Sequence, residues 1–175
     1  MPQHIFQHTP GCVLSGDEVR KLVVEEKLIE NYIDLDKQVQ PNGFDCTLKA
    51  VYRIKGVGKI DFDNTERVLP EVEELKFDGD WVFLDRGVYR ARINEIVNLP
   101  RNLMAFARPR SSLIRCGANV LTAVWDAGYR GRSEVGIVVY NGLWLKKNAR
   151  IVQLVFIRLS GESEGYSGIY QNEGI

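Results

Sequence analysis

The chain has 175 residues, of which 45% are hydrophobic and 26% are charged, as in an ordinary folded domain that buries a core without disulfide bonds or a structural metal. Lys plus Arg and Asp plus Glu are equal at 23 each, so no net charge draws the chain to nucleic acid or to an anionic membrane. This balance disfavours a nucleic-acid-binding role but permits a local basic pocket.

The cysteine and histidine content bears on metal chemistry and on compartment. Cys12, Cys46 and Cys116 form no Cys-x-x-Cys pair, and His4 and His8 both lie near the start. A zinc-dependent deaminase needs a His/Cys ligand set with a neighbouring Glu, which this pattern does not supply. Unpaired thiols fit a reducing, cytoplasmic compartment. No apolar run approaches the ~20 residues of a membrane span, and we expect neither a span nor a signal peptide.

In chain order, we expect an N-terminal arm over residues 1–14, one domain over 15–160 and a C-terminal tail over 161–175. Ser15 to Glu18 read as a capping box, which predicts a helix from Asp17 to about Ile29. No other segment is a convincing helix. The tail is rich in Gly, Ser and Glu, and we expect it to be mobile unless a ligand or neighbour holds it.

After Asn42-Gly43 the chain changes to short runs rich in Val, Ile, Phe and Tyr, separated by Asp, Asn and Gly turns. Many short strands at this spacing favour a sandwich or a barrel over βαβ units. The predicted strands are Phe44 to Ile54, Trp81 to Leu84, Val88 to Ile93, Asn119 to Trp125, Val135 to Tyr140 and Arg150 to Leu159.

Two segments carry residues suited to nucleotide chemistry. Asp126-Ala127-Gly128-Tyr129-Arg130-Gly131 offers a carboxylate that can orient a water and an aromatic ring that can cover a sugar. The alternative is a plain hairpin turn, for which Asp and Gly are the usual residues. Upstream, Arg110, Ser111 and Ser112 offer a cation and two hydroxyls, which suit a polyphosphate. The alternative there is a solvated loop with a helix cap at Ser111 or Ser112.

Further candidates lie around these segments. Arg115 falls one helical turn after Ser112 and is expected beside the same anion. Gln153 interrupts an apolar strand pattern, and a buried amide needs a partner, either a phosphate or a backbone group. Tyr166 and Tyr170 flank a Gly in the tail and could close over a base as a lid, although a frayed end is the simpler interpretation.

In this order the motifs resemble the superfamily that contains dUTP diphosphatase and dCTP deaminase, and the resemblance covers roughly residues 13 to 171. It implies a distorted jelly-roll β-barrel of the dUTPase-like type with a short N-terminal helix, assembled as a homotrimer with active sites between subunits. It also implies Mg²⁺ held mainly by the triphosphate, with no protein metal site. The matching segments are Gly43 to Leu48, Glu95 to Pro100, Arg110 to Gly117, Asp126 to Gly131, Arg150 to Leu154 and Tyr166 to Gln171.

The resemblance implies a role for each candidate. Asp126 orients and partly deprotonates the attacking water, and Arg110, Ser111, Ser112 and Gln153 hold the phosphates. Tyr129 packs against the deoxyribose. The further substrate contacts are Arg115 at the phosphates, the backbone from Asn119 to Val124 with the Asn119 side chain at the base, and Tyr166 and Tyr170 in the tail.

Two chemistries share this scaffold. Deaminases of the family carry a catalytic Glu in the strand after the third motif. Counted back from Asn141 this position is Val138, and counted forward from Asp126 it is Gly136. The strand instead matches the diphosphatase pattern, with Arg132 and Ser133 as an apparent two-residue insertion. We therefore expect hydrolysis of dUTP to dUMP and pyrophosphate, which cleanses the nucleotide pool and supplies the dTTP precursor. Glu134 keeps dCTP deaminase or bifunctional activity as the alternative, and a non-catalytic nucleotide-binding trimer is a second.

Overall fold

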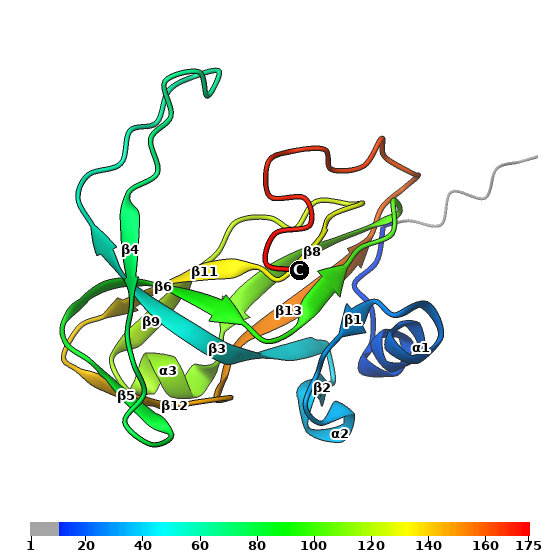
Figure 1. The fold of residues 1–175 in the computed structure, drawn as a ribbon. Coiled ribbons are helices and arrows are strands. Elements are labelled where there is room, and N and C mark those ends of the chain that lie inside the picture. Colours follow the sequence, from blue (N-terminus) through cyan, green and yellow to red (C-terminus); the bar gives the residue numbers. More distant parts are fainter. Residues whose placement is uncertain (1–10) are drawn as a thin grey trace, which may run out of the picture.

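The computed structural model describes residues 11–175, and strands make up most of their regular structure (Figure 1). Six strands form the main path of an eight-stranded sheet, in the order β8-β13-β3-β6-β11-β9, and all their pairings are antiparallel. Two short strands pair with β3 outside this path. The bounds are β2 Val39–Gln40, β3 Gly43–Lys55, β4 Glu71–Glu74, β6 Gly87–Ile93, β8 Leu103–Pro109, β9 Ala118–Leu121, β11 Glu134–Val139 and β13 Arg150–Arg158.

The two edges of this sheet come together. Ala105 on β8 exchanges two main-chain hydrogen bonds, each 2.9 Å long, with Trp125, which lies beyond the end of β9. Thr122 Oγ1 also donates to the Ala107 carbonyl oxygen at 3.1 Å. The sheet is therefore nearly closed, and the expected mainly β, barrel-like fold is confirmed.

Two smaller sheets complete the structure. One has the order β1-β7-β10 and joins the N-terminal region to the segment after Tyr129, while the other is the pair β12-β5. Their bounds are β1 Ile29–Glu30, β5 Trp81–Leu84, β7 Ile96–Asn98, β10 Arg130–Gly131 and β12 Leu143–Lys146.

The core lies inside the barrel, where apolar side chains from facing strands meet. On β13, Val152, Leu154 and Phe156 are buried and alternate with more exposed neighbours, as the period of two in a strand requires. Phe44 from β3 and Tyr89 from β6 are likewise buried. Burial of this apolar area, worth ~25 cal/mol per Å², is the main force that holds the barrel together.

Helix α1 (Gly16–Glu26) confirms the predicted capping box, because the Ser15 side chain accepts from the Glu18 amide and the Glu18 side chain accepts from the Ser15 amide. The helix ends before the predicted Ile29. Lys27 adopts φ = 55°, after which Leu28 and Ile29 are buried in the core. Two short helices that we did not predict are also present, α2 (Leu35–Gln38) and α3 (Ser111–Arg115).

The predicted strands are present, but one is shorter and others were missed. β9 ends at Leu121 instead of Trp125, since the chain leaves β11 there and turns toward β8. β8 escaped prediction although its side chains alternate between buried and more exposed. β4 is entirely exposed and rich in Glu, and it exists because it pairs with β3.

The C-terminal tail lies against its own chain in this structure. Tyr166 N donates to the Ala127 carbonyl oxygen at 2.8 Å, and Asn172 N donates to that of Arg130 at 2.7 Å. Of the predicted N-terminal arm, residues 1–10 lie outside the described residues. The three cysteines are free thiols. Within residues 11–175, no helix is long and apolar enough to cross a membrane.

Gly43 offers a test of this packing. A Cβ at this position would collide with the Leu154 carbonyl oxygen on β13, and neither strand can move without disturbing the barrel. We expect Gly43→Ala to lower the free energy of unfolding by at least ~2 kcal/mol, measured by urea denaturation.

The matched control is Gly161→Ala, where a Cβ has no atom within 4 Å. We expect this variant to unfold at the wild-type urea concentration. Equal stability of the two variants would contradict the close approach of β3 and β13 at Gly43.

Candidate functional site

Asp126 lies at a turn between the strand-like segment at Trp125 and β10. The Tyr129 amide donates to the Asp126 carbonyl oxygen at 3.1 Å, and Gly128 adopts φ = 81°. The segment is therefore a turn, and this turn presents an exposed carboxylate. The main chain before Asp126 is fixed by the pairing of Trp125 with Ala105.

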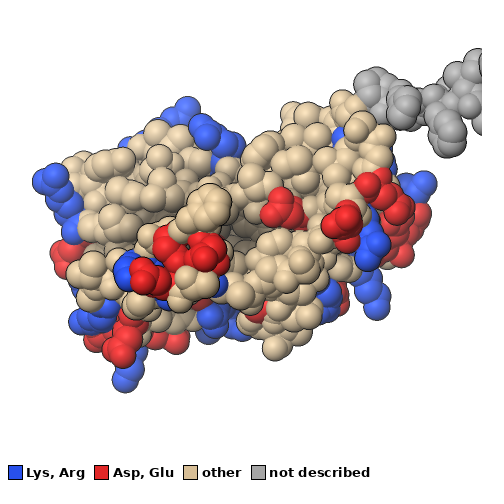
Figure 2. Space-filling view, turned by 90° about the horizontal axis from the view of Figure 1, so that it is seen from above, with Lys and Arg blue, Asp and Glu red and all other residues tan. Residues whose placement is uncertain are grey.

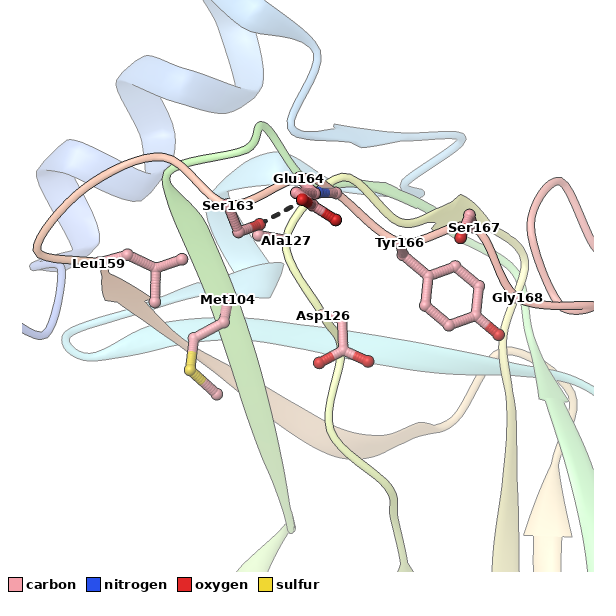
Figure 3. A pocket seen from close by; sticks show the side chains of 10 residues that line it. Met104, Asp126, Ala127, Leu159, Ser163, Glu164, Tyr166, Ser167 and Gly168 are labelled. Atoms are coloured by element: carbon pink, nitrogen blue, oxygen red, sulfur yellow. Dashed lines mark hydrogen bonds between the residues drawn. The ribbon is translucent and has the colours of Figure 1, made fainter. Parts of the chain in front are cut away.

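A cavity of about 600 Å³ opens on one side of Asp126. Figure 3 shows the Asp126 carboxylate facing this space, with Met104 and Leu159 on one side and the Tyr166 ring on the other. The tail from Ser163 to Gly168 forms the remaining wall. The segment that we expected to act as a lid therefore forms one wall of this open cavity.

A smaller cavity of about 160 Å³ shares Asp126 and Tyr166 with the larger one and is also lined by Tyr129 and Tyr170. The Tyr129 ring is buried and meets the Tyr166 ring edge-on, with centroids 5.7 Å apart. Burial raises the pKa of Tyr129, so its hydroxyl stays protonated at neutral pH. The third motif and the tail thus bring four of the predicted site residues together.

The predicted phosphate residues gather elsewhere, around α3. Arg110 is the N-cap residue of this helix and has no side-chain cap bond, so the alternative of a helix cap at Ser111 or Ser112 is wrong. Ser111 and Ser112 form the first turn and are exposed, and Arg115 is exposed in the last turn. The hydroxyls and the Arg115 guanidinium are therefore accessible to a ligand.

Arg110 is held by a residue that the site prediction did not include. Asp45 is fully buried, and its Oδ2 contacts Arg110 Nε at 3.0 Å and Arg150 Nη1 at 3.2 Å. Burial raises the pKa of Asp45, whereas the two guanidinium groups act in the opposite direction. Among residues 11–175, its buried Oδ1 has no hydrogen-bond partner. Gly43-Phe44-Asp45 was already part of the first motif, which was the signal for this role.

Gln153 and Asn119 lie toward the same end of the barrel as Arg110. Gln153 pairs with Arg108 on β8 and with Asp45 on β3, but its side chain is only half-buried. It does not require the buried partner that we had expected. Asn119 Oδ1 accepts from the Val120 amide at 2.9 Å, which leaves its side-chain amino group for a ligand.

The segment from Thr122 to Val124 runs beside β8 without joining it. Among the described residues, its main-chain amides and carbonyls have no protein hydrogen-bond partner. A groove of about 560 Å³ separates this segment from Phe106, Ala107 and Arg108. Unpaired main-chain donors and acceptors beside a groove are what reading a planar base edge requires.

The two clusters lie at opposite ends of β8 (Figure 1). Trp125 pairs with Ala105 near the start of the strand, and Arg110 follows Ala105 by five extended positions, or roughly 17 Å at ~3.3 Å per residue. One chain therefore separates the predicted site residues into two groups. We refer to the group around Asp126, Tyr129, Tyr166 and Tyr170 as the Asp126 half-site and to the group around Arg110, Ser111, Ser112 and Arg115 as the Arg110 half-site.

Glu134, the carboxylate that kept deamination open, is clamped by two arginines. Arg90 Nε donates to Oε2 at 2.7 Å and Arg92 Nη2 donates to Oε1 at 2.6 Å. The Glu134 side chain is only 12% exposed. Both oxygens are engaged by charge-assisted hydrogen bonds, so the group is poorly placed to take a proton from a substrate.

Figure 2 views the face that carries the tail and shows it hollowed near the centre, with Asp and Glu side chains on both sides of the hollow. After Arg158 the chain has no Lys or Arg, and the tail contributes Glu162, Glu164 and Glu173. The tail therefore adds negative charge at this half-site. Within residues 11–175, no group of three or more His, Cys, Asp or Glu side chains could hold a metal ion.

Asp45 provides a test of the phosphate half-site. We expect Asp45→Asn to lower the free energy of unfolding by about 2 kcal/mol, because it leaves two guanidinium groups without their buried partner. The control is Asp36→Asn, which breaks an ion pair with Arg20 in which Asp36 is 86% exposed, and which should cost less than ~0.5 kcal/mol. Equal losses in urea denaturation would contradict the role of Asp45.

Comparison with known proteins places this architecture in a family. The dCTP deaminase-like family model matches residues 13–159. A probable deoxyuridine 5'-triphosphate nucleotidohydrolase of Archaeoglobus fulgidus is 66% identical over 166 residues, covering 94% of this chain and 98% of the relative. The deoxyuridine 5'-triphosphate nucleotidohydrolase of Methanocaldococcus jannaschii is 36% identical, covering 86% and 99%.

Among solved structures, the 2'-deoxycytidine 5'-triphosphate deaminase of Agrobacterium tumefaciens superposes with a TM-score of 0.66 at 23% identity. The match covers 85% of this chain and 48% of that protein, and at this identity it bears on the fold alone. With the family model spanning most of the barrel, the chain belongs to the dCTP deaminase-like family.

Proposed function

We propose that this protein hydrolyses dUTP to dUMP and pyrophosphate. The observation that carries the proposal is the exposed Asp126 carboxylate between two cavities, one of them lined by Tyr129. The names of the archaeal relatives that are 56–66% identical, all probable deoxyuridine 5'-triphosphate nucleotidohydrolases, support the same substrate.

In this proposal Asp126 holds the attacking water and takes its proton as general base. Tyr129 lies under the deoxyribose, where its buried ring leaves little space for a 2′-hydroxyl. The main chain from Thr122 to Val124 reads the uracil edge, assisted by Asn119. Tyr166 and Tyr170 close the tail over the nucleotide.

The phosphates bind Arg110, Ser111, Ser112, Arg115 and Gln153. The resemblance implies that Mg²⁺ would be held mainly by the triphosphate oxygens. When bound, the ion neutralises charge that develops on the phosphates. Arg110, oriented by Asp45, stabilises the same charge from the protein side.

We propose further that the enzyme is a homotrimer in which each active site combines half-sites from different chains. Asp126 and Arg110 of one chain are too far apart to serve one phosphate, and the resemblance implies sites between subunits. Assembly would bring the Asp126 half-site of one chain against the Arg110 half-site of its neighbour. A head-to-tail contact of this kind closes into a ring.

The deaminase alternative is weaker because of the clamp on Glu134, whose two oxygens are held by Arg90 and Arg92. Deamination of cytosine needs a carboxylate that shuttles protons at the base. A nucleotide-binding trimer without turnover is weaker still, since Asp126 is exposed to both cavities.

The proposal predicts the products and one decisive variant. With Mg²⁺, pure protein should release dUMP and pyrophosphate from dUTP and no ammonia from dCTP. Asp126→Asn should reduce the rate by ~10²–10⁴-fold, whereas Asp85→Asn in an exposed turn should not change it. Chromatography of the nucleotides separates these outcomes. Ammonia from dCTP, or full activity of Asp126→Asn, would overturn the assignment.

The shared site predicts complementation between two inactive variants. Asp126→Asn and Arg110→Ala subunits, unfolded and refolded together in equal amounts, should recover activity because about a quarter of all sites then combine two intact half-sites. Each variant refolded alone is the control, and size-exclusion chromatography checks for trimers. If the mixture stays as inactive as its parents, each site belongs to one chain.

A further inference from the structure

Arg132 and Ser133, which the sequence comparison marks as an apparent insertion, link the third motif to the C-terminal tail. Arg132 N donates to the Glu173 carbonyl oxygen at 2.8 Å, and Arg132 Nε donates to the Gly174 carbonyl oxygen at 3.1 Å. Ser133 is 4% exposed and reaches the tail through Tyr129. The insertion and the end of the tail therefore form one local structure.

Ser133 lies in a hydrogen-bond chain that runs from Trp125 to Glu173. Trp125 Nε1 donates to Ser133 Oγ at 2.7 Å, Ser133 Oγ lies 2.8 Å from the Tyr129 hydroxyl, and that hydroxyl donates to Glu173 Oε1 at 2.8 Å. An indole nitrogen only donates and an ionised carboxylate only accepts. Because Trp125 can only donate and Glu173 can only accept, the Ser133 hydroxyl donates to Tyr129. Every hydrogen bond of the series is therefore donated in the direction of Glu173.

This series of hydrogen bonds connects the proposed lid, which is the C-terminal tail, with the proposed general base, Asp126. Trp125 immediately precedes Asp126, and its main chain is tied to Ala105. Its indole ring is held by Ser133 alone among side-chain hydrogen-bond partners in the described residues. At the other end, Glu173 lines the cavity beside Tyr129 together with Tyr166 and Tyr170 of the tail.

The glycines of the third motif permit this close approach. A Cβ on Gly131 would collide with the Tyr129 hydroxyl and lie 3.2 Å from Glu173 Cγ. A Cβ on Gly128 would lie 2.8 Å from Gly165 Cα in the tail. The docked tail therefore requires glycine at position 128, and the Tyr129 hydroxyl, which donates to Glu173, requires glycine at position 131.

We infer that Ser133 is a positioning residue that couples docking of the C-terminal tail to the orientation of the Trp125-Asp126 segment. The inference rests on the proposed hydrolysis and adds to it a link between lid closure and the base. When the tail leaves, Tyr129 loses its acceptor in Glu173, and the hydrogen bonds that orient Ser133 and Trp125 weaken together.

The test is a double-mutant cycle of Ser133→Ala and Glu173→Ala, read first without substrate. Hydrogen exchange at the Tyr166 and Asn172 amides, which are bonded only while the tail is docked, should accelerate about fivefold to tenfold in each single variant. The double variant should exchange no faster than the singles. Glu173→Gln, which keeps an acceptor for Tyr129, should behave as wild type.

Turnover provides the second readout. Ser133→Ala and Glu173→Ala should each lower kcat for dUTP by about fivefold to tenfold, with KM changed less than about twofold. The exposed Ser160→Ala is the matched control and should leave exchange and kcat unchanged. Thermal melting of every variant separates these effects from a loss of folding.

Two outcomes would overturn the coupling. One is a double variant whose fold-change in tail amide exchange equals the product of the two single fold-changes, which means that Ser133 and Glu173 act independently. The other is unchanged tail exchange in Ser133→Ala, which confines Ser133 to packing around Trp125. Because exchange is measured without substrate, these results stand even if the wild-type protein fails to hydrolyse dUTP.

Discussion

The register of β13 between β8 and β3 is the constraint on which the proposed phosphate site depends. Gln153 lies opposite Arg108 on one neighbour and opposite Asp45 on the other, so one position of β13 aligns three motifs that are far apart in sequence. A shift of the register by one residue would turn Gln153 inward and expose Val152 or Leu154. The loss of this buried apolar area would destabilise the fold. The apolar alternation of one strand thereby fixes where the Arg110 half-site forms.

The same sheet decides how Glu134 is used. β11 pairs with β6 so that Glu134 lies opposite Arg92, with Arg90 two residues along the same face. Cross-strand neighbours of opposite charge stabilise a sheet modestly, but here they also occupy the only carboxylate of β11. A carboxylate two residues further on would occupy the position of Gly136, opposite Arg90 and next to Leu121. The position of the acid on β11 thus decides whether its carboxylate is held by both arginines.

Much of the fold could be predicted because local signals and burial agree. The capping box at Ser15 and the alternating strands β3, β6, β11 and β13 have both, and they are present with small shifts at their ends. β4 could not be predicted, since three glutamates on an exposed edge carry no hydrophobic period and depend on pairing with β3. The end of α1 was misplaced because Leu28 and Ile29 continue the apolar pattern but belong to the core beyond the helix.

The sequence motifs predicted which residues form the candidate site, but not that these residues lie in two separate groups. The motifs identify Asp126 and Arg110 as site residues. The distance between them follows from the length of β8, a strand that we did not predict from the sequence. Asp45, Ser133 and Glu173 were missed as site residues because their roles arise from contacts between distant segments. A single Ser or Glu in a polar loop carries no local sign of such a contact.

The C-terminal tail is held in a way that permits it both to dock on the third motif and to leave it. Its composition predicts mobility, yet it lies against the third motif, held by hydrogen bonds that Tyr166 N and Asn172 N donate, that the Gln171 side chain donates and accepts, and that Glu173 accepts from Tyr129. Segments held in this way open at a small fraction of the free energy of global unfolding. Tyr166 is the exception, because its ring packs on Tyr129 and both rings line the cavity beside Asp126. A nucleotide that filled this cavity would therefore add contacts to the docked tail alone, and would close the tail by differential binding.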